Sequence, residues 1–285
     1  MASPDSMTAA LDVLKQSFGH DGFRPGQAPV VDAMLRGRDV LAVMPTGAGK
    51  SLCYQVPALV MDGLTIVVSP LVALMEDQVA ALQLNGIAAE TINSGRDRDT
   101  NVAAWRRVAA GEVRLLYLSP ERLMTQRMIA ALQTLNPVLF AVDEAHCISR
   151  WGAAFRPEYE ELRALKSAFP GARLAAFTAT ADPATRDDIC GKLLGDAPQV
   201  FVAGFDRPNI TLTVAPRARW QDQVPAFLRS RPEESGSIYC LSRKNVEDVA
   251  AHLRAEGLNA LPYHAGMDPA ARAAHQDRIM TESPV

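Results

Sequence analysis

Residues 40–51 read Val-Leu-Ala-Val-Met-Pro-Thr-Gly-Ala-Gly-Lys-Ser, an apolar run that leads through a glycine-rich turn into a helical pattern. This order of strand, loop and helix is the arrangement in which backbone N–H groups surround a phosphate. Gly47 and Gly49 allow a tight turn that points successive N–H groups inward. We therefore predict a phosphate-binding loop, with contacts from Thr46, Gly47, Ala48, Gly49, Lys50 and Ser51.

The last two residues of this loop have the side chains that a nucleoside triphosphate requires. Lys50 is placed to reach the β- and γ-phosphates, and the Ser51 hydroxyl can bind the Mg²⁺ that bridges them. The pattern is G-x-x-x-x-G-K-[ST] except that Met44 stands at its first position. A turn with these residues by coincidence is the alternative, which the flanking strand and helix disfavour. ATP and Mg²⁺ are the predicted ligands.

Two adjacent carboxylates follow a second apolar run, Leu139-Phe140-Ala141-Val142. We expect Asp143 to hold the magnesium and Glu144 to orient the attacking water. Charged residues commonly end strands, so this pair alone is weak evidence for a nucleotide site. Its position downstream of a phosphate loop makes the evidence strong. His146 follows closely, and it is not expected to bind a metal because no Cys or His cluster accompanies it.

Composition limits the remaining possibilities. The chain has 285 residues, of which 48% are hydrophobic, so it has room for about two domains with sizeable cores. No apolar stretch is long enough to span a bilayer, and no membrane is expected. The four cysteines lack C-x-x-C spacing, so zinc and disulfides are not expected and the thiols fit a reducing cytoplasm. A net charge of −3 means that any nucleic-acid surface is local.

Strand-like runs alternate with helical patterns along residues 1–205. This alternation predicts an α/β fold, a parallel sheet with helices on both faces, whose ligands bind at the carboxyl ends of the strands. Ser69-Pro70, Ser119-Pro120 and Thr178-Ala179-Thr180 end strand-like runs, as the phosphate loop does. They are therefore expected on one rim.

A second unit is expected to begin after a connection at residues 206–219. In residues 220–285, the segments 237–241 and 260–264 have strand-like sequences, and 245–256 and 269–280 have helical ones. These elements are too few to complete a sheet covered on both faces. We therefore expect the chain to end inside its second domain.

Taken together, these motifs resemble the RecQ helicases of superfamily 2, from about Leu11 to Arg278. The resemblance implies two RecA-like domains, the second incomplete here, and ATP-driven 3′-to-5′ unwinding of DNA. Single-stranded and partially duplex DNA are the implied partners, in a bacterial cytoplasm or nucleoid. The matching stretches are 23–27 (Phe-Arg-Pro-Gly-Gln), 44–55, 69–71 (Ser-Pro-Leu), 119–123 (Ser-Pro-Glu-Arg-Leu), 143–149 (Asp-Glu-Ala-His-Cys-Ile-Ser), 178–181 (Thr-Ala-Thr-Ala), 205–210 (Phe-Asp-Arg-Pro-Asn-Ile) and 263–266 (Tyr-His-Ala-Gly).

The resemblance assigns residues 23–27 to adenine recognition. The Gln27 amide carries a donor and an acceptor and can read both edges of adenine, while Arg24 can stack on the ring. A water-facing Gln27 in the first turn of a helix is the alternative. His20 stands where relatives often have a tyrosine that stacks on adenine, and an imidazole can stack as well.

Residues 150–159 contain three aromatic residues on a Gly- and Pro-containing stretch, and they resemble the RecQ aromatic-rich loop that couples DNA binding to ATP hydrolysis. Trp151 and Phe155 beside Arg156 suit stacking on unpaired bases and contact with phosphates. Packing beneath the loop is the alternative, and for Tyr159 it is equally favoured. Ala153-Ala154 stands where the family usually has His-Asp, which puts efficient coupling in doubt.

Other assignments rest on the resemblance more than on the residues. His146 is implied to link the nucleotide site to Thr178-Ala179-Thr180 by hydrogen bonds. The resemblance also implies DNA-phosphate contacts for Ser69, Ser119, Ser242 and Arg243, although a serine after a strand is often only a helix cap.

The family's later motifs, including the arginines that the second lobe directs to the γ-phosphate, would lie beyond Val285. The chain is therefore expected to bind nucleotide better than it hydrolyses it. Two alternatives stay open: another superfamily 2 translocase that acts on RNA, and a nucleotide-dependent DNA-binding module that does not hydrolyse.

Overall fold

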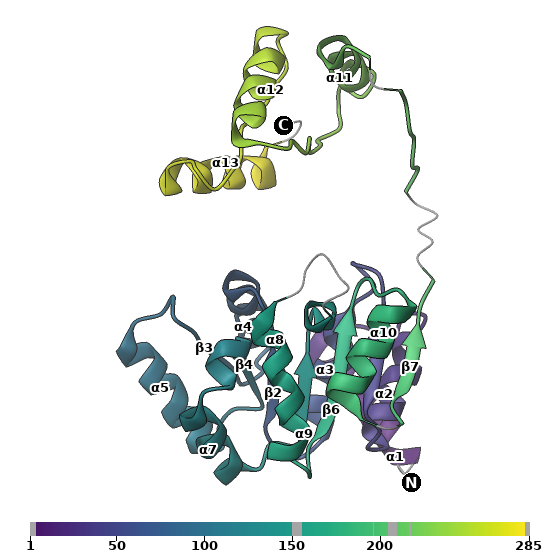
Figure 1. Cartoon of the computed structure of the whole chain (residues 1–285), viewed down its shortest axis with the longest axis vertical. Helices are drawn as coiled ribbons and strands as arrows, with labels where there is room; N and C mark the ends of the chain where they lie inside the picture. The colour runs from purple at the N-terminus through teal and green to yellow at the C-terminus, as the bar shows by residue number, and fades with distance from the viewer. Residues whose placement is uncertain (1–3, 150–155, 196, 205–209, 217, 283–285) are drawn as a thin grey trace. The chain divides into compact units, whose positions relative to one another are not determined.

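The computed structural model describes residues 4–149, 156–195, 197–204, 210–216 and 218–282. The chain divides into two compact units, Met1–Arg207 and Pro208–Val285. The first unit contains a sheet covered by helices on both faces, and the described part of the second contains helices and extended segments (Figure 1).

The sheet of the first unit has seven strands in the order β3-β4-β2-β5-β6-β1-β7, and every neighbouring pair is parallel. Parallel neighbours require crossover connections, which the helices supply. The predicted α/β class with a parallel sheet is therefore confirmed. The strands are β1 (Val40–Val43), β2 (Thr65–Val68), β3 (Ala89–Ile92), β4 (Leu115–Leu118), β5 (Leu139–Val142), β6 (Arg173–Thr178) and β7 (Gln199–Val202).

Alternate residues of each central strand face two separate cores. In β1, Val40 and Ala42 belong to one buried cluster, whereas Leu41 and Val43 belong to the other. The first core packs against α1 (Pro4–Phe18), α2 (Gln27–Leu35), α3 (Lys50–Val60) and α4 (Val72–Leu84). The second packs against α5 (Arg98–Ala109), α6 (Pro120–Leu123), α7 (Gln126–Leu135), α8 (Pro157–Glu160), η2 (Glu161–Ala164), α9 (Leu165–Ala168), α10 (Pro183–Ile189) and the π-helical turn η3 (Cys190–Leu194).

Burial on both faces explains why β1, β2, β4, β5 and β6 have near-continuous apolar sequences. β3 differs because it contains Glu90, which is buried beside Arg107 and forms an ion pair with it. β7 lies at the sheet edge, where Val200 and Val202 stay partly exposed. The charged Glu90 interrupts the apolar pattern of β3, and neither β3 nor β7 was among the predicted strands.

In the described part of the second unit, three helices form and no strand does. The helices are α11 (Trp220–Arg229), α12 (Arg243–Ala255) and α13 (Pro269–Thr281). The prediction of strands at 237–241 and 260–264 is therefore wrong for this structure. Tyr239 and Leu241 are 96% and 98% exposed. A parallel strand forms only when a neighbour satisfies its backbone groups and covers its side chains, and these segments lack both.

Candidate functional site

The phosphate loop connects the end of β1 to the first residue of α3. Gly47 and Gly49 have φ angles of 85° and 76°, a left-handed conformation that glycine adopts without strain. Lys50 is the first residue of α3, and its Nζ donates to the Met44 carbonyl at 3.3 Å. The N-terminus of an eleven-residue helix thus faces the loop, as a phosphate site requires.

Gln27 supports this loop from beneath. Its side chain is 1% exposed, and Nε2 donates to the carbonyls of Ala48 and Gly49, both at 3.0 Å. Its Oε1 accepts from the Arg24 backbone N–H at 2.8 Å. A Cβ at position 49 would lie 2.5 Å from Gln27 Nε2, so glycine is required there. The water-facing alternative for Gln27 is wrong because the side chain is buried. Adenine reading stays a prediction, and it would require the amide to exchange its bonds with residues 24, 48 and 49 for bonds to the base.

The remaining residues expected at the nucleotide differ in their exposure. Arg24 donates from Nη1 to the Gly47 carbonyl at 2.9 Å, which brings its guanidinium to the loop. Thr46 and His20 are exposed, and Ser51 is half-buried in the first turn of α3. The stacking roles of Arg24 and His20 stay predictions.

The carboxylate pair ends β5, which is separated from β1 by β6 alone. Asp143 is 6% exposed, and its Oδ1 accepts from the Glu144 backbone N–H at 2.9 Å. Glu144 has φ 49° and ψ 42°, a left-handed conformation that is uncommon for a residue with a side chain. Such conformations cost roughly 1–3 kcal/mol and cluster at functional sites.

The pKa of Asp143 is raised to about 6, chiefly by burial and secondly by the neighbouring Glu144 carboxylate. The Glu144 backbone N–H and the nearby Lys50 ammonium act in the opposite direction. The carboxyl ends of β1 and β5 lie on the same edge of the parallel sheet, so the loop and the carboxylates are on one rim. Mg²⁺ prefers oxygen ligands, and the Asp143 carboxylate and the Ser51 hydroxyl are groups of that kind.

His146 connects this pair to the next strand. It lies in the short helix η1 (Ala145–Ile148), and its Nδ1 is 2.9 Å from Thr178 Oγ1 and 3.3 Å from Glu144 Oε2. Thr178 Oγ1 in turn donates to the Thr180 carbonyl at 3.0 Å. The expected hydrogen bond from His146 to the 178–180 segment is present, and a catalytic role for His146 stays a prediction.

The aromatic-rich stretch is described only from Arg156 onward. Trp151, Phe155 and Ala153-Ala154 lie outside the described residues, so their predicted roles stay predictions. Arg156 donates from Nη1 to the Pro70 carbonyl at 3.2 Å, next to Ser69.

Tyr159 is fully buried, and its hydroxyl donates to the Asp143 carbonyl at 2.9 Å. Of the two alternatives for this residue, packing inside the protein is therefore the one observed. Its bond to Asp143 was not predicted, because a single tyrosine carries no sequence signal for a backbone partner.

The other expected DNA contacts are engaged locally or buried. Ser69 is buried, and its hydroxyl has no hydrogen-bond partner among the described residues. Ser242 caps α12 by accepting from the Asn245 N–H at 3.2 Å, which is the local role weighed as its alternative. Arg243 lies against Gly266, where a Cβ would be 2.9 Å from its Nη1.

The described part of the chain contains neither a metal-binding cluster nor a membrane-spanning helix. Residues 4–282, apart from the gaps given above, contain no group of three or more His, Cys, Asp or Glu residues arranged to hold a metal ion. In the same part of the chain, no helix combines the length and apolarity needed to cross a membrane.

Comparison with known proteins extends this picture. The protein-family model for the DEAD/DEAH box helicases matches residues 24–189. The ATP-dependent DNA helicase RecQ of Haemophilus influenzae is 47% identical over 274 residues, which cover 96% of this chain and 44% of that protein. RecQ of Bacillus subtilis is 36% identical over 275 residues, which cover 96% of this chain and 46% of that protein. The chain therefore spans less than half the length of these relatives.

Solved structures show the same fold at low sequence identity. The DUF1998 helicase MrfA bound to DNA and AMPPNP has a TM-score of 0.70 and 18% identity, covering 98% of this chain and 43% of that one. Mss116p bound to ssRNA and AMP-PNP has a TM-score of 0.66 and 16% identity, covering 99% of this chain and 62% of that one. The sheet is of the RecA-like helicase type, and the predicted similarity to RecQ helicases is confirmed. The chain belongs to the DEAD/DEAH box helicase family.

Proposed function

We propose that this chain is the ATP-binding part of a RecQ-type DNA helicase that couples ATP hydrolysis to 3′-to-5′ translocation on single-stranded DNA. The observation that carries the proposal is the convergence of the phosphate loop and the carboxylate pair at the carboxyl ends of β1 and β5. The RecQ names of two similar relatives support DNA as the polymer and ATP as the energy source.

Each residue of the site has a role that follows from its chemistry. Backbone N–H groups of residues 46–51 bind the phosphates, and the Lys50 ammonium neutralises charge on the β- and γ-phosphates. Ser51 and Asp143 would hold Mg²⁺, which when bound supplies further positive charge. Glu144 accepts a proton from the attacking water and orients it. His146, bonded to Thr178, links this carboxylate to the 178–180 segment.

The proposed division of labour follows the predicted boundaries. Residues 1–205 bind ATP, with His20, Arg24 and Gln27 at the adenine, and residues 206–219 lead to the second domain at 220–285. Ser69, Trp151, Phe155 and Arg156 contact single-stranded or partially duplex DNA from the first domain, and Ser242 and Arg243 do so from the second. A bacterial cytoplasm or nucleoid is the proposed location.

We further propose that the 285 residues alone hydrolyse ATP slowly. In phosphoryl transfer, an arginine directed at the γ-phosphate contributes a factor of roughly 10³–10⁵ to the rate. RecQ relatives are more than twice as long as the region that matches this chain, which supports a further contribution from outside these residues.

Single-turnover hydrolysis with protein in excess over ATP tests the proposal, because it detects slow chemistry. Single-stranded DNA should raise the hydrolysis rate more than RNA of the same length. Glu144→Gln should abolish hydrolysis but retain ATP binding, since it keeps the shape and removes the base. Hydrolysis equal in the variant and the parent, or stimulated by RNA alone, would overturn the proposal.

A further inference from the structure

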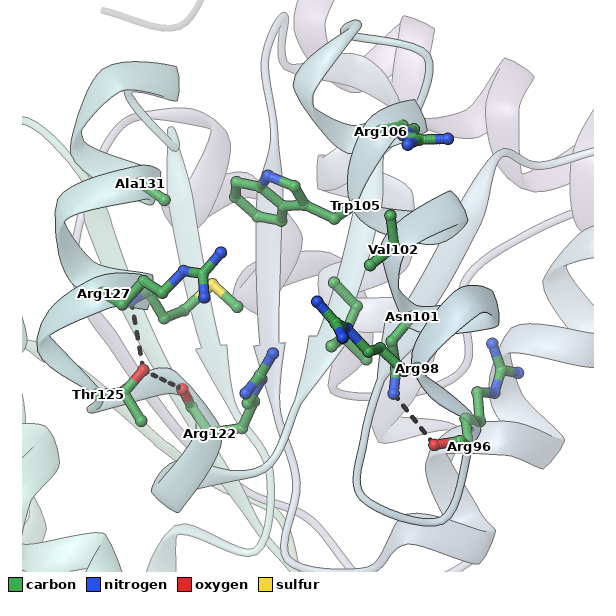
Figure 2. Close-up of a pocket in the computed structure, with 12 residues that line it drawn as sticks. Arg96, Arg98, Asn101, Val102, Trp105, Arg106, Arg122, Thr125, Arg127 and Ala131 are labelled. Carbon is green, nitrogen blue, oxygen red and sulfur yellow. Dashed lines mark hydrogen bonds between the residues drawn. The ribbon is translucent and has the colours of Figure 1, made fainter.

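A groove of about 580 Å³ lies between α5 and the α6–α7 segment, beside the end of β3. It is formed by residues from 92 to 131, none of which belongs to the phosphate loop or to the carboxylate pair. Figure 2 shows Trp105 extending from α5 across the space toward α7. The groove is therefore a separate feature of the first unit.

Three arginines direct their side chains into this groove. Figure 2 shows Arg98 entering from the start of α5, and Arg122 and Arg127 entering from the opposite wall. None of the three guanidiniums has a hydrogen bond or an ion pair among the described residues. Arg96 differs, because it forms ion pairs with Glu76 at 3.3 Å and Glu90 at 3.9 Å. Three unpaired like charges around one hollow repel each other and favour an anionic ligand.

The surface between the arginines is apolar. The Trp105 side chain packs against the buried core and leaves one part exposed to the groove, and Met128 is buried beneath. Val102 is 38% exposed on the same wall. An exposed apolar surface framed by arginines is typical of protein interaction sites, where Trp and Arg contribute most of the binding energy.

The neutral polar side chains of the groove are already bonded within the protein. Asn101 donates to the carbonyls of Asn93 and Arg96, and its oxygen accepts from the Asn93 N–H. The Thr125 hydroxyl donates to the Arg122 carbonyl and accepts from the Met128 N–H. Among the described lining side chains, the Trp105 indole N–H is the one neutral donor left, so a nucleobase edge buried here would keep most of its polar groups unpaired. An aliphatic or aromatic side chain has no such requirement.

We propose that this groove docks an acidic peptide segment of a partner protein. One apolar side chain of the peptide contacts Trp105 and Met128, and flanking carboxylates pair with Arg98, Arg122 and Arg127. Arginine suits this role because its planar guanidinium binds carboxylates in bidentate fashion.

Fluorescence anisotropy of the full chain tests the proposal. The probe is a short fluorescein-labelled peptide with a central phenylalanine flanked on both sides by aspartates. We expect saturable binding that weakens as salt is added. Arg122→Glu combined with Arg127→Glu should weaken binding by about tenfold or more. Both arginines are exposed, so the variant should fold, and an unchanged melting curve would confirm this.

The matched control is Arg163→Glu, an exposed arginine of the same unit outside the groove, which should keep the peptide affinity within about twofold. A second peptide, with glycine in place of the phenylalanine, should bind at least about tenfold more weakly because the apolar contact is lost. Equal binding of the two peptides would overturn the proposal. It would also be overturned if Arg163→Glu weakened binding as much as the double variant. A third result would also contradict the proposal. In it, the parent chain binds a thymidine oligonucleotide but not the peptide, and the double variant loses the oligonucleotide binding.

Discussion

Two segments with similar sequences have opposite fates in this molecule. Leu115-Leu116-Tyr117-Leu118 forms β4, fully buried between β3 and β2, whereas Ser237 to Leu241 forms no strand and leaves Leu241 98% exposed. Each segment ends in a leucine that precedes a serine. The difference shows that strand formation depends on neighbours that cover both backbone and side chains, and that local preference alone does not produce it.

The largest expected difference between the two segments is in their amide hydrogen-exchange rates. The amides of β4 open only with the whole sheet, whereas those of 238–241 lack strand partners. We expect exchange at 115–118 to be slower by a factor of about a thousand or more, measured by mass spectrometry of the intact chain. Similar rates in both segments would mean that the comparison is wrong.

The second largest difference is expected in the stability lost when the last leucine of each segment is replaced by alanine. Leu118→Ala removes a fully buried side chain and should lower the free energy of unfolding of the first unit by about 2–5 kcal/mol. Leu241→Ala removes an exposed one and should change stability by less than about 0.5 kcal/mol. Urea denaturation measures both, and a comparable loss in the two variants would show that 237–241 is packed in solution.

The two units also differ in the pKa shifts of their carboxylates. Burial raises the pKa of Asp143 in the first unit to about 6, whereas the Arg229 guanidinium lowers the pKa of the exposed Glu256 in the second. Carbonyl-detected NMR should therefore show Asp143 titrating near pH 6 and Glu256 titrating below its ordinary value.

The stability consequence for Asp143 has a definite sign. Because its folded-state pKa is raised, its contribution to stability is present below pH of about 4 and is lost as pH rises through about 6. Asp143→Asn should remove this pH dependence. An Asp143 that titrates near pH 4 would contradict its burial.

The smallest expected effect concerns one hydrogen bond in each unit. Tyr159→Phe removes the donor to the Asp143 carbonyl and should lower the stability of the first unit by about 0.5–1.5 kcal/mol. Tyr263→Phe removes a partly exposed bond to Gln276 and should cost less. Thermal unfolding followed by circular dichroism compares them, and an unaffected Tyr159→Phe variant would remove this bond from the account.

These contrasts explain which features could be predicted from sequence. Five strands were recognisable because burial on both faces demands continuous apolar residues. Glu90 concealed β3, since its partner Arg107 comes from a helix elsewhere in the chain. The strands expected at 237–241 and 260–264 were wrong because their sequences do not reveal whether neighbours are present.

The candidate site also contains some features that could be predicted from sequence and others that could not. The phosphate loop and Asp143-Glu144 were predictable because their chemistry requires those residue types at strand ends. The left-handed backbone of Glu144 and the Gln27 amide beneath the loop were not predictable. The Gln27 bonds join segments that are more than twenty residues apart, and the Glu144 backbone departs from the conformation that a residue with a side chain ordinarily prefers.

The central claim is that the first unit contains a nucleotide site built around Lys50, and calorimetric titration of the chain with MgATP tests it most directly. We expect one site, and Lys50→Ala should weaken binding by about 2–3 kcal/mol, or roughly a hundredfold, because a charged hydrogen bond to the phosphates is lost. Lys244→Ala, at an exposed lysine of the second unit, should leave the affinity unchanged. Equal MgATP affinity for the parent chain and Lys50→Ala would contradict the account.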